Sequence, residues 1–151
     1  MRVFRSLDEL TAAVGEEIGP TDWLTITQQR VDTFADATGD HQWIHIDVER
    51  AKAESPFGGP IAHGFMTLSL VVPLATQTYT ITDAKMGVNY GLNKVRFPAP
   101  VPVGAKVRLT ATLKDVEEVA GGLQVTIAGV IEAEGASKPV CIAEPVFRVY
   151  G

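Results

Sequence analysis

The most apolar part of the chain reads Ile61-Ala62-His63-Gly64-Phe65-Met66-Thr67-Leu68-Ser69-Leu70-Val71-Val72-Pro73-Leu74-Ala75. It lies within residues 55–82, which contain no Asp, Glu, Lys or Arg. A membrane span needs about 20 apolar residues, but Pro60 starts this segment, Pro73 interrupts it, and several Ser and Thr side chains add polar groups. The pattern is more typical of a helix that is buried on all sides inside a protein. We expect about 18 residues of helix, roughly 27 Å long.

Strand patterns follow this segment. Residues 86–97 form one candidate strand, and residues 106–114 and 123–131 alternate apolar and polar side chains with the period of two of a half-buried strand. Gly121-Gly122 is suited to the hairpin between the last two, and residues 140–150 give a final strand. Several antiparallel strands and one buried helix predict an α+β fold in which an antiparallel sheet wraps around a long central helix.

Shorter elements are expected before the apolar segment. Ser6 can cap a short helix, and Thr27 can cap a second helix from Gln28 to about Thr38, which Gly39 ends. Residues 23–26 read as a strand and residues 48–54 as a helix. The apolar stripes of the two capped helices consist of Leu7, Leu10, Ala13 and Val14 in the first, and Val31, Phe34, Ala35 and Thr38 in the second.

Composition is that of one folded domain spanning residues 1–151. Hydrophobic residues make up 46% and charged residues 21%, which is typical of a globular protein. The net charge of −5 argues against general nucleic-acid binding. The single Cys141 excludes an intramolecular disulfide and fits a reducing compartment. Residues 1–10 turn acidic before an apolar region develops, so they do not form a secretory signal, and we expect a cytoplasmic protein without membrane contact.

The heptapeptide Gly39-Asp40-His41-Gln42-Trp43-Ile44-His45 carries the candidate chemistry. Asp40 and His45 are five positions apart, so on a helix they would point about 140° apart, and on a strand they would lie on opposite faces. They can meet only across a turn, which Gly39 can supply through the left-handed conformation. A carboxylate and an imidazole held together can bind one water molecule and move its protons without metal or cofactor. Alternatively, Gly-Asp is an ordinary helix end and His45 a structural residue.

Four segments resemble one known family. Residues 34–45, Phe34-Ala35-Asp36-Ala37-Thr38-Gly39-Asp40-His41-Gln42-Trp43-Ile44-His45, resemble a signature in which an aromatic residue precedes Gly-Asp-x-Asn-Pro-aliphatic-His. Residues 60–64, Pro60-Ile61-Ala62-His63-Gly64, resemble the start of the family's central helix, and residues 91–97 and 98–104 its strand and following turn. In order and spacing, from about Thr21 to Val149, the chain is similar to the MaoC-like (R)-specific enoyl-CoA hydratases of the hot-dog fold.

The resemblance implies a lyase of fatty acid metabolism. The reaction would be reversible syn addition of water to a trans-2-enoyl-CoA, or to an acyl-carrier-protein thioester, giving an (R)-3-hydroxyacyl thioester. Asp40 and His45 would hold the water and transfer its protons, and the N–H of Gly64 would stabilise the thioester oxygen. Gly64 has an alternative interpretation as a site of tight packing. No cofactor is implied, since coenzyme A is part of the substrate, and no metal is implied.

Substrate contacts are expected from a further set of residues. Gln42 could supply an amide, although Gln42-Trp43 departs from the Asn-Pro of the signature. The half of the chain from residue 76 onward has eight Lys and Arg against seven Asp and Glu, a net charge of +1, whereas the first 75 residues have five against 11, a net charge of −6. An anionic ligand should therefore prefer the second half. The residues assigned to substrate are Gln42, His63, Asn93, Lys94 and Arg96. The antiparallel sheet would leave edge strands exposed, and the resemblance to hot-dog proteins, which pair two subunits, implies a homodimer with thioester sites near the interface.

Three other functions stay open at this stage. A thioester hydrolase of the same fold would also use a carboxylate and a helix N-terminus, but does not usually carry Gly-Asp followed five residues later by His. A non-catalytic acyl-thioester binder, or a partner subunit in a hetero-oligomer, would not need both Asp40 and His45. A metal site built from Asp40, His41, His45 and His63 is disfavoured because their spacing is irregular and no second cluster accompanies it.

Overall fold

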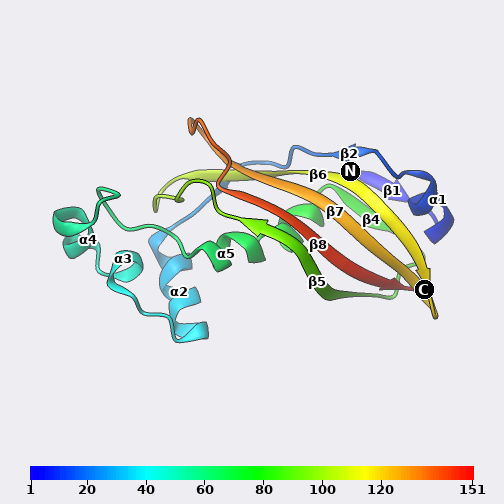
Figure 1. Cartoon of the computed structure of the whole chain (residues 1–151), viewed down its shortest axis with the longest axis horizontal. Helices are drawn as coiled ribbons and strands as arrows, with labels where there is room; N and C mark the ends of the chain where they lie inside the picture. Colours follow the sequence, from blue (N-terminus) through cyan, green and yellow to red (C-terminus); the bar gives the residue numbers. More distant parts are fainter.

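The computed structural model describes residues 1–151, and its main feature is a curved six-stranded antiparallel sheet (Figure 1). The strand order is β2 (Glu17–Ile18), β6 (Lys106–Val119), β7 (Gly122–Ala133), β8 (Cys141–Tyr150) and β5 (Met86–Arg96), and β3 (Leu24–Thr25) also pairs with β6. Strand β5 therefore lies at an edge and is hydrogen-bonded only to β8. The predicted antiparallel sheet is confirmed, and with it the α+β class.

The long strands form where the sequence alternates. In β6, Val107, Leu109, Ala111 and Leu113 are buried, while the residues between them are partly exposed, so one face of the strand covers the core. The expected β6–β7 hairpin is present, but its two turn residues are Ala120 and Gly121, one position earlier than predicted, and Gly122 already pairs with Val119 as the first residue of β7. A single cluster of 26 buried apolar residues fills the space between the sheet and the helices.

The predicted long central helix is wrong in its length. The apolar segment forms two short consecutive helices, α5 (Gly64–Ser69) and α6 (Val71–Ala75), which together span roughly 18 Å at 1.5 Å per residue. They separate at Leu70, whose N–H is shared between the carbonyl oxygens of Met66 and Thr67 at 3.2 Å each. Pro73 explains the break, because it has no N–H to donate to the carbonyl of Ser69 and its ring crowds that carbonyl.

The prediction that this segment is buried on all sides is also wrong for the single chain. Phe65 is 72% exposed and Val72 38%, whereas Met66, Val71 and Leu74 are buried. The exposed face lies beside β5, in which ten of 11 residues are exposed. The alternating large side chains of β5 that reach the surface are Met86, Val88, Tyr90 and Leu92. The helix and the edge strand therefore share one uncovered apolar face.

Smaller elements complete the chain. At one end, β1 (Arg2–Phe4) and β4 (Tyr79–Ile81) form a parallel pair beside α1 (Leu7–Ala12). At the other end, α2 (Gln28–Thr38), α3 (Trp43–Ile46) and α4 (Val48–Glu54) extend beyond the sheet (Figure 1). The helices at 28–38 and 48–54 match the expected ranges, while β1, β2, β4 and α3 were not expected. None of the helices combines the length and the apolar character that a membrane crossing requires.

Gly122 provides a test of the sheet register. A methyl group at this position would lie 2.0 Å from the carbonyl oxygen of Val149 on β8. We expect Gly122→Ala to lower the free energy of unfolding by about 1–3 kcal/mol, because backbone must move to accept the methyl group. Urea denaturation measures the change. Gly59→Ala is the matched control, since a methyl group there has no neighbour within 4 Å, and equal stabilities of the two variants would contradict the register.

Candidate active site

The end of helix α2 sets the position of Asp40. Gly39 has a φ of 82° and donates its N–H to the carbonyl of Ala35 at 2.8 Å, so the helix stops in the left-handed conformation that glycine favours. In the next residues the carboxylate of Asp40 accepts the N–H of Gln42 at 3.3 Å, which makes a tight turn. Helix α3 begins directly after this turn. The predicted turn at Gly39 is confirmed.

His45 lies on α3 and is held in one orientation. Its side chain is buried, with 7% of the residue exposed, and its Nδ1–H donates to the carbonyl oxygen of Ile61 at 2.6 Å. Because a carbonyl can only accept, the hydrogen must be on Nδ1. The Nε2 atom of the neutral ring is therefore left as a proton acceptor.

A second contact holds the backbone of His45. The side-chain amide of Gln28, the first residue of α2, donates to the carbonyl oxygen of His45 at 2.8 Å and to the carboxylate of Asp32 at 2.9 Å. Sequence reasoning missed this residue. A Gln at the start of a helix carries no signal for a contact 17 positions away, which exists only because α2 and α3 pack together.

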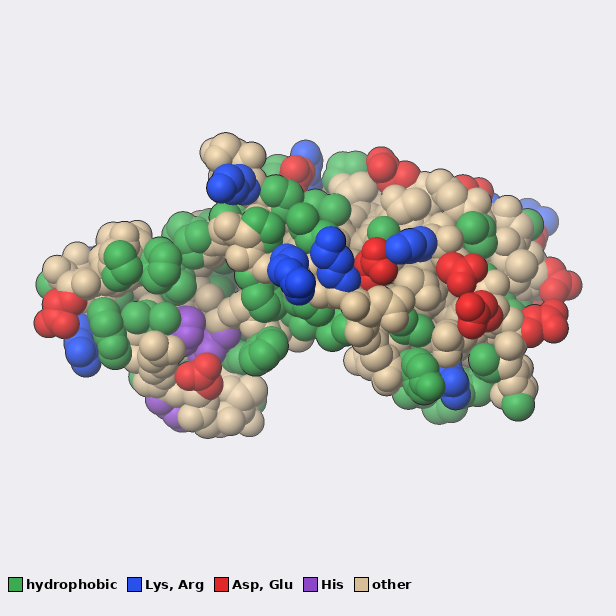
Figure 2. Space-filling view, in the orientation of Figure 1, with side chains coloured by type: hydrophobic (Ala, Val, Ile, Leu, Met, Phe, Trp, Pro, Cys, Tyr) green, Lys and Arg blue, Asp and Glu red, His purple; other side chains and the backbone are tan.

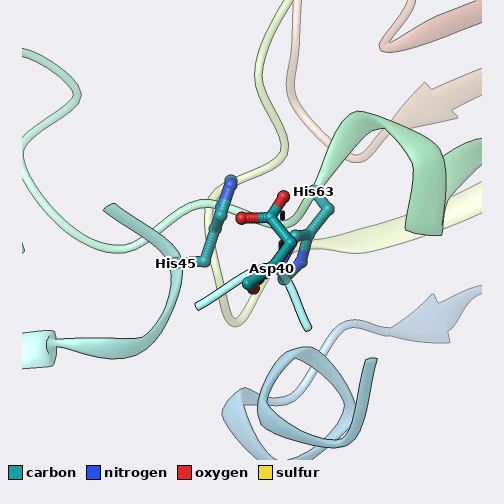
Figure 3. Close-up of side chains that lie close together, drawn as sticks. All are labelled: Asp40, His45 and His63. Atoms are coloured by element: carbon teal, nitrogen blue, oxygen red, sulfur yellow. Dashed lines mark hydrogen bonds and ion pairs between the residues drawn. The ribbon is translucent and has the colours of Figure 1, made fainter. Parts of the chain in front are cut away.

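Asp40, His45 and His63 form one cluster (Figure 3). A carboxylate oxygen of Asp40 and a ring nitrogen of each histidine all lie within 4.8 Å of one another. The two imidazole rings stack with their centroids 3.9 Å apart and their planes at 25°. The side chain of Asp40 is 53% exposed, whereas that of His63 is 3% exposed. The cluster therefore has a buried imidazole side and a carboxylate that meets solvent.

Burial sets the charge state of His45. Its pKa is lowered from the usual 6.5, first by loss of hydration and also by the neighbouring imidazole of His63, while the carbonyl of Ile61 and the carboxylate of Asp40 act in the opposite direction. His45 is consequently neutral at pH 7. A neutral imidazole beside a carboxylate can accept a proton from a bound water and return it.

The same cluster offers three atoms of the type that bind metal ions. A tetrahedral zinc site requires ligand lone pairs that converge on one point. The lone pairs of an imidazole lie in the plane of its ring, so two stacked rings direct their lone pairs side by side. His41 lies outside the cluster and pairs with Asp36 at 2.8 Å. This hydrogen bond is the main reason why the pKa of His41 is raised. The arrangement favours acid–base chemistry over metal binding.

Gly64 adjoins the cluster as the first residue of α5. Its N–H makes no hydrogen bond within the protein, so it is free to donate. A methyl group at this position would lie 3.0 Å from the ring of Phe97, which means that tight packing also requires glycine here. The two interpretations of Gly64 are compatible, because the ring contacts the α-carbon side and leaves the amide unpaired.

The structure separates the expected substrate residues into two groups. Gln42 is exposed at the start of α3, and His63 is buried within the cluster. Asn93, Lys94 and Arg96 are exposed on β5, and Phe97, directly after that strand, reaches Gly64. Figure 2 shows Lys and Arg side chains over the middle of the sheet, beside the end of the molecule that carries the histidines.

The chain is similar to known proteins over nearly its whole length. The family described as MaoC like domain matches residues 9–136. 3-Hydroxyacyl-thioester dehydratase Z of Mycobacterium tuberculosis is 57% identical over 149 residues, which covers 98% of this chain and 98% of that protein.

Two solved structures are similar over most of the chain. The monoamine oxidase regulatory protein of Archaeoglobus fulgidus has a TM-score of 0.81 at 25% identity, covering 99% of this chain and 96% of that one. The unliganded R-hydratase PhaJ1 of Pseudomonas aeruginosa has a TM-score of 0.73 at 21% identity, covering 91% and 81%. At this identity the second likeness supports the fold alone.

The burial of His45 should make the free energy of unfolding depend on pH. Since its folded-state pKa lies below 6.5, the unfolded chain binds a proton first, and the free energy of unfolding should fall as pH drops below about 6.5. In His45→Gln this fall should be weaker, because the group that binds the proton is gone. Urea denaturation between pH 7.5 and about 5 measures the slope.

His41→Gln is the control, because it should change the pH dependence of the free energy of unfolding in the opposite direction. The raised pKa of His41 means that the folded state binds its proton first, so it stabilises the fold below about 6.5 and loses this effect as pH rises. Removing it should steepen the fall in stability towards acid. Equal slopes in the two variants would contradict the assigned environments.

Proposed function

Because the chain belongs to the family of MaoC-like dehydratases, we propose that it catalyses the reversible hydration of a trans-2-enoyl thioester to an (R)-3-hydroxyacyl thioester. The protein is a hydratase/dehydratase, a lyase. The observation that carries the finer proposal is the pairing of a buried, neutral His45, whose Nε2 is free, with the solvent-facing carboxylate of Asp40.

In this proposal one water molecule lies between Asp40 and the Nε2 atom of His45. One of the two groups accepts a water proton while the oxygen forms a bond to C3 of the enoyl group. The π electrons of the C2–C3 bond move towards the thioester carbonyl, and a proton delivered to C2 completes the addition. Oxygen and proton reach the same face because both come from groups on one side of the substrate, which gives syn addition.

The thioester oxygen gains negative charge in the transition state. The N–H of Gly64 is the proposed donor to this oxygen, since it is unpaired and adjoins the cluster through His63. Helix α5 has only six residues, so the proposal relies on this individual N–H and not on a helix dipole. One such donor is worth about 10²–10³ in rate.

The proposed substrate is a thioester of coenzyme A or of acyl carrier protein, and no cofactor or metal takes part. Lys94 and Arg96 would bind the phosphates of the carrier, with Asn93 close to the pocket and Gln42 contributing an amide at its mouth. Support comes from charge and placement: Lys94 and Arg96 are exposed without a carboxylate partner, on the strand whose end reaches Gly64.

Incubation with crotonyl-CoA tests the reaction directly. Hydration removes the enoyl absorbance without releasing a thiol, and the product should be the (R)-3-hydroxy isomer. Release of free thiol would instead identify a thioester hydrolase, and binding without any change would identify a non-catalytic binder. A product of S configuration would contradict the proposed stereochemistry.

Two substitutions test the acid–base pair. Asp40→Asn removes the carboxylate charge, and His45→Asn removes the proton acceptor Nε2 while its amide nitrogen, at the position of Nδ1, can still donate to the carbonyl of Ile61. Each should lower kcat/KM for crotonyl-CoA by roughly 10²–10⁴, because a positioned acid–base group contributes that much. Thermal unfolding controls for loss of fold. Near-normal turnover in either folded variant would contradict the acid–base role of the residue that was replaced.

We further propose that the protein is a homodimer joined through β5. The open face of α5 and α6 beside this strand contains two apolar hollows of about 520 and 490 Å³. A strand with one unpaired edge and exposed Val88 and Tyr90, next to such hollows, is the surface that a second copy would cover.

Val88→Asp should weaken this association, because it places a charge on the exposed apolar face of the edge strand. Val130→Asp is the matched control: Val130 is 38% exposed and Val88 41%, but Val130 lies on the central strand β7. Analytical ultracentrifugation should show a dimer for the wild type and for Val130→Asp, and a larger monomer fraction for Val88→Asp. Equal dimer fractions in both variants would place the interface elsewhere.

A further inference from the structure

His63 contacts both members of the proposed acid–base pair. Its Nε2–H donates to the backbone carbonyl of Asp40 at 3.0 Å, and one face of its ring stacks on His45. The ring of Phe34 is a further neighbour, with centroids 4.8 Å apart. The acceptor role of the Asp40 carbonyl requires the hydrogen of His63 to be on Nε2. Its Nδ1 atom is buried and has no hydrogen-bond partner.

The bond from His63 is the anchor of Asp40 to the interior. The other hydrogen bonds of Asp40 are local: its N–H donates to the hydroxyl of Thr38 at 3.4 Å, and its carboxylate accepts from Gln42 at 3.3 Å. The hydrogen bond from His63 crosses 23 positions of sequence. An exposed turn held only by bonds within itself can shift as a unit, so the distance from Asp40 to His45 depends on this contact.

The second effect of His63 is electrostatic. Two stacked imidazoles disfavour a second positive charge, and His63 contributes to the lowered pKa of His45. The groups that face His45 are the His63 ring, the Asp40 carboxylate, the carbonyl of Ile61 and the neutral amide of Gln28, and the ring of Phe34 faces His63 from its own side.

We propose that His63 is a positioning residue, which holds the turn at Asp40 and the ring of His45 at the separation that one water molecule requires and keeps His45 ready to accept a proton. This inference rests on the proposed hydration. In this role His63 acts through Asp40 and His45, whereas the sequence predicted a direct contact between His63 and the substrate. A purely packing role would not require the nitrogen atom that binds the Asp40 carbonyl.

Two variants separate the two effects. His63→Phe keeps a ring for the stack but removes the Nε2–H, and His63→Gln keeps an amide N–H near the position of Nε2 but removes the ring. We expect His63→Phe to lower kcat for crotonyl-CoA by about 10- to 100-fold, since a small displacement of catalytic groups costs that much, with little change in KM. His63→Gln should retain most of the wild-type kcat.

In both variants the acidic limb of the pH–kcat/KM profile should move to higher pH, because His45 would bind a proton more readily.

An NMR titration gives a readout that does not depend on turnover. The chain has three histidines, so His41→Gln and His45→Gln assign their ring signals. The pKa of His45 should rise in both His63 variants. If the wild type hydrates no enoyl thioester but this rise is seen, the proposed function fails while the coupling of the two histidines stands.

Several results would overturn the role of His63. They are an unchanged kcat in folded His63→Phe, an equal loss of kcat in both variants without movement of the acidic limb, or an unchanged titration of His45. Should His63→Phe fail to fold, as thermal unfolding would show, the pH profile and titration of His63→Gln still decide the outcome.

Discussion

The extended segment 60–63 is hydrogen-bonded on both sides, and the site depends on this constraint. On one side, the N–H of Ala62 donates to the carbonyl of Val101, in the loop between β5 and β6, at 2.8 Å. Towards the helices, Ile61 donates its N–H to the backbone of α3 at 3.0 Å and accepts the ring N–H of His45. One short segment therefore connects the loop between β5 and β6 to the helix that carries the imidazole, and it ends at His63 and the start of α5.

The environments of the two groups in the proposed acid–base pair, His45 and Asp40, differ in a way that suits the proposed chemistry. His45 is buried and neutral, and a neutral imidazole with its N–H satisfied loses little on leaving water. The carboxylate of Asp40 stays half exposed, where hydration stabilises its charge. In the proposed reaction these surroundings place a neutral proton acceptor beside a solvent-facing carboxylate, with one water molecule bound between them. Neither group has to be metal-bound for this to work.

Several features were predictable because they are local. The alternation in β6 and β7, the β6–β7 hairpin and the end of α2 at Gly39 all follow from patterns a few residues long. The elements that were missed, such as β1, β2 and α3, have only two to four residues, too few to show a period. The length of the central helix was overestimated because the apolar run was given more weight than Pro73, which is visible in the sequence and removes a helical hydrogen bond. An apolar run also does not show which face a single chain leaves open.

The sequence by itself determined that Asp40 and His45 could meet only across a turn, and that Gly39 would supply it, because backbone preferences act over neighbouring residues. Only the tertiary structure decided that His63 stacks on His45, that Ile61 selects the tautomer of His45, and that Gln28 holds its backbone. These contacts join positions 16 to 18 apart in the chain. They form when the packing of the core brings the segments together, and no short pattern in the sequence encodes that packing.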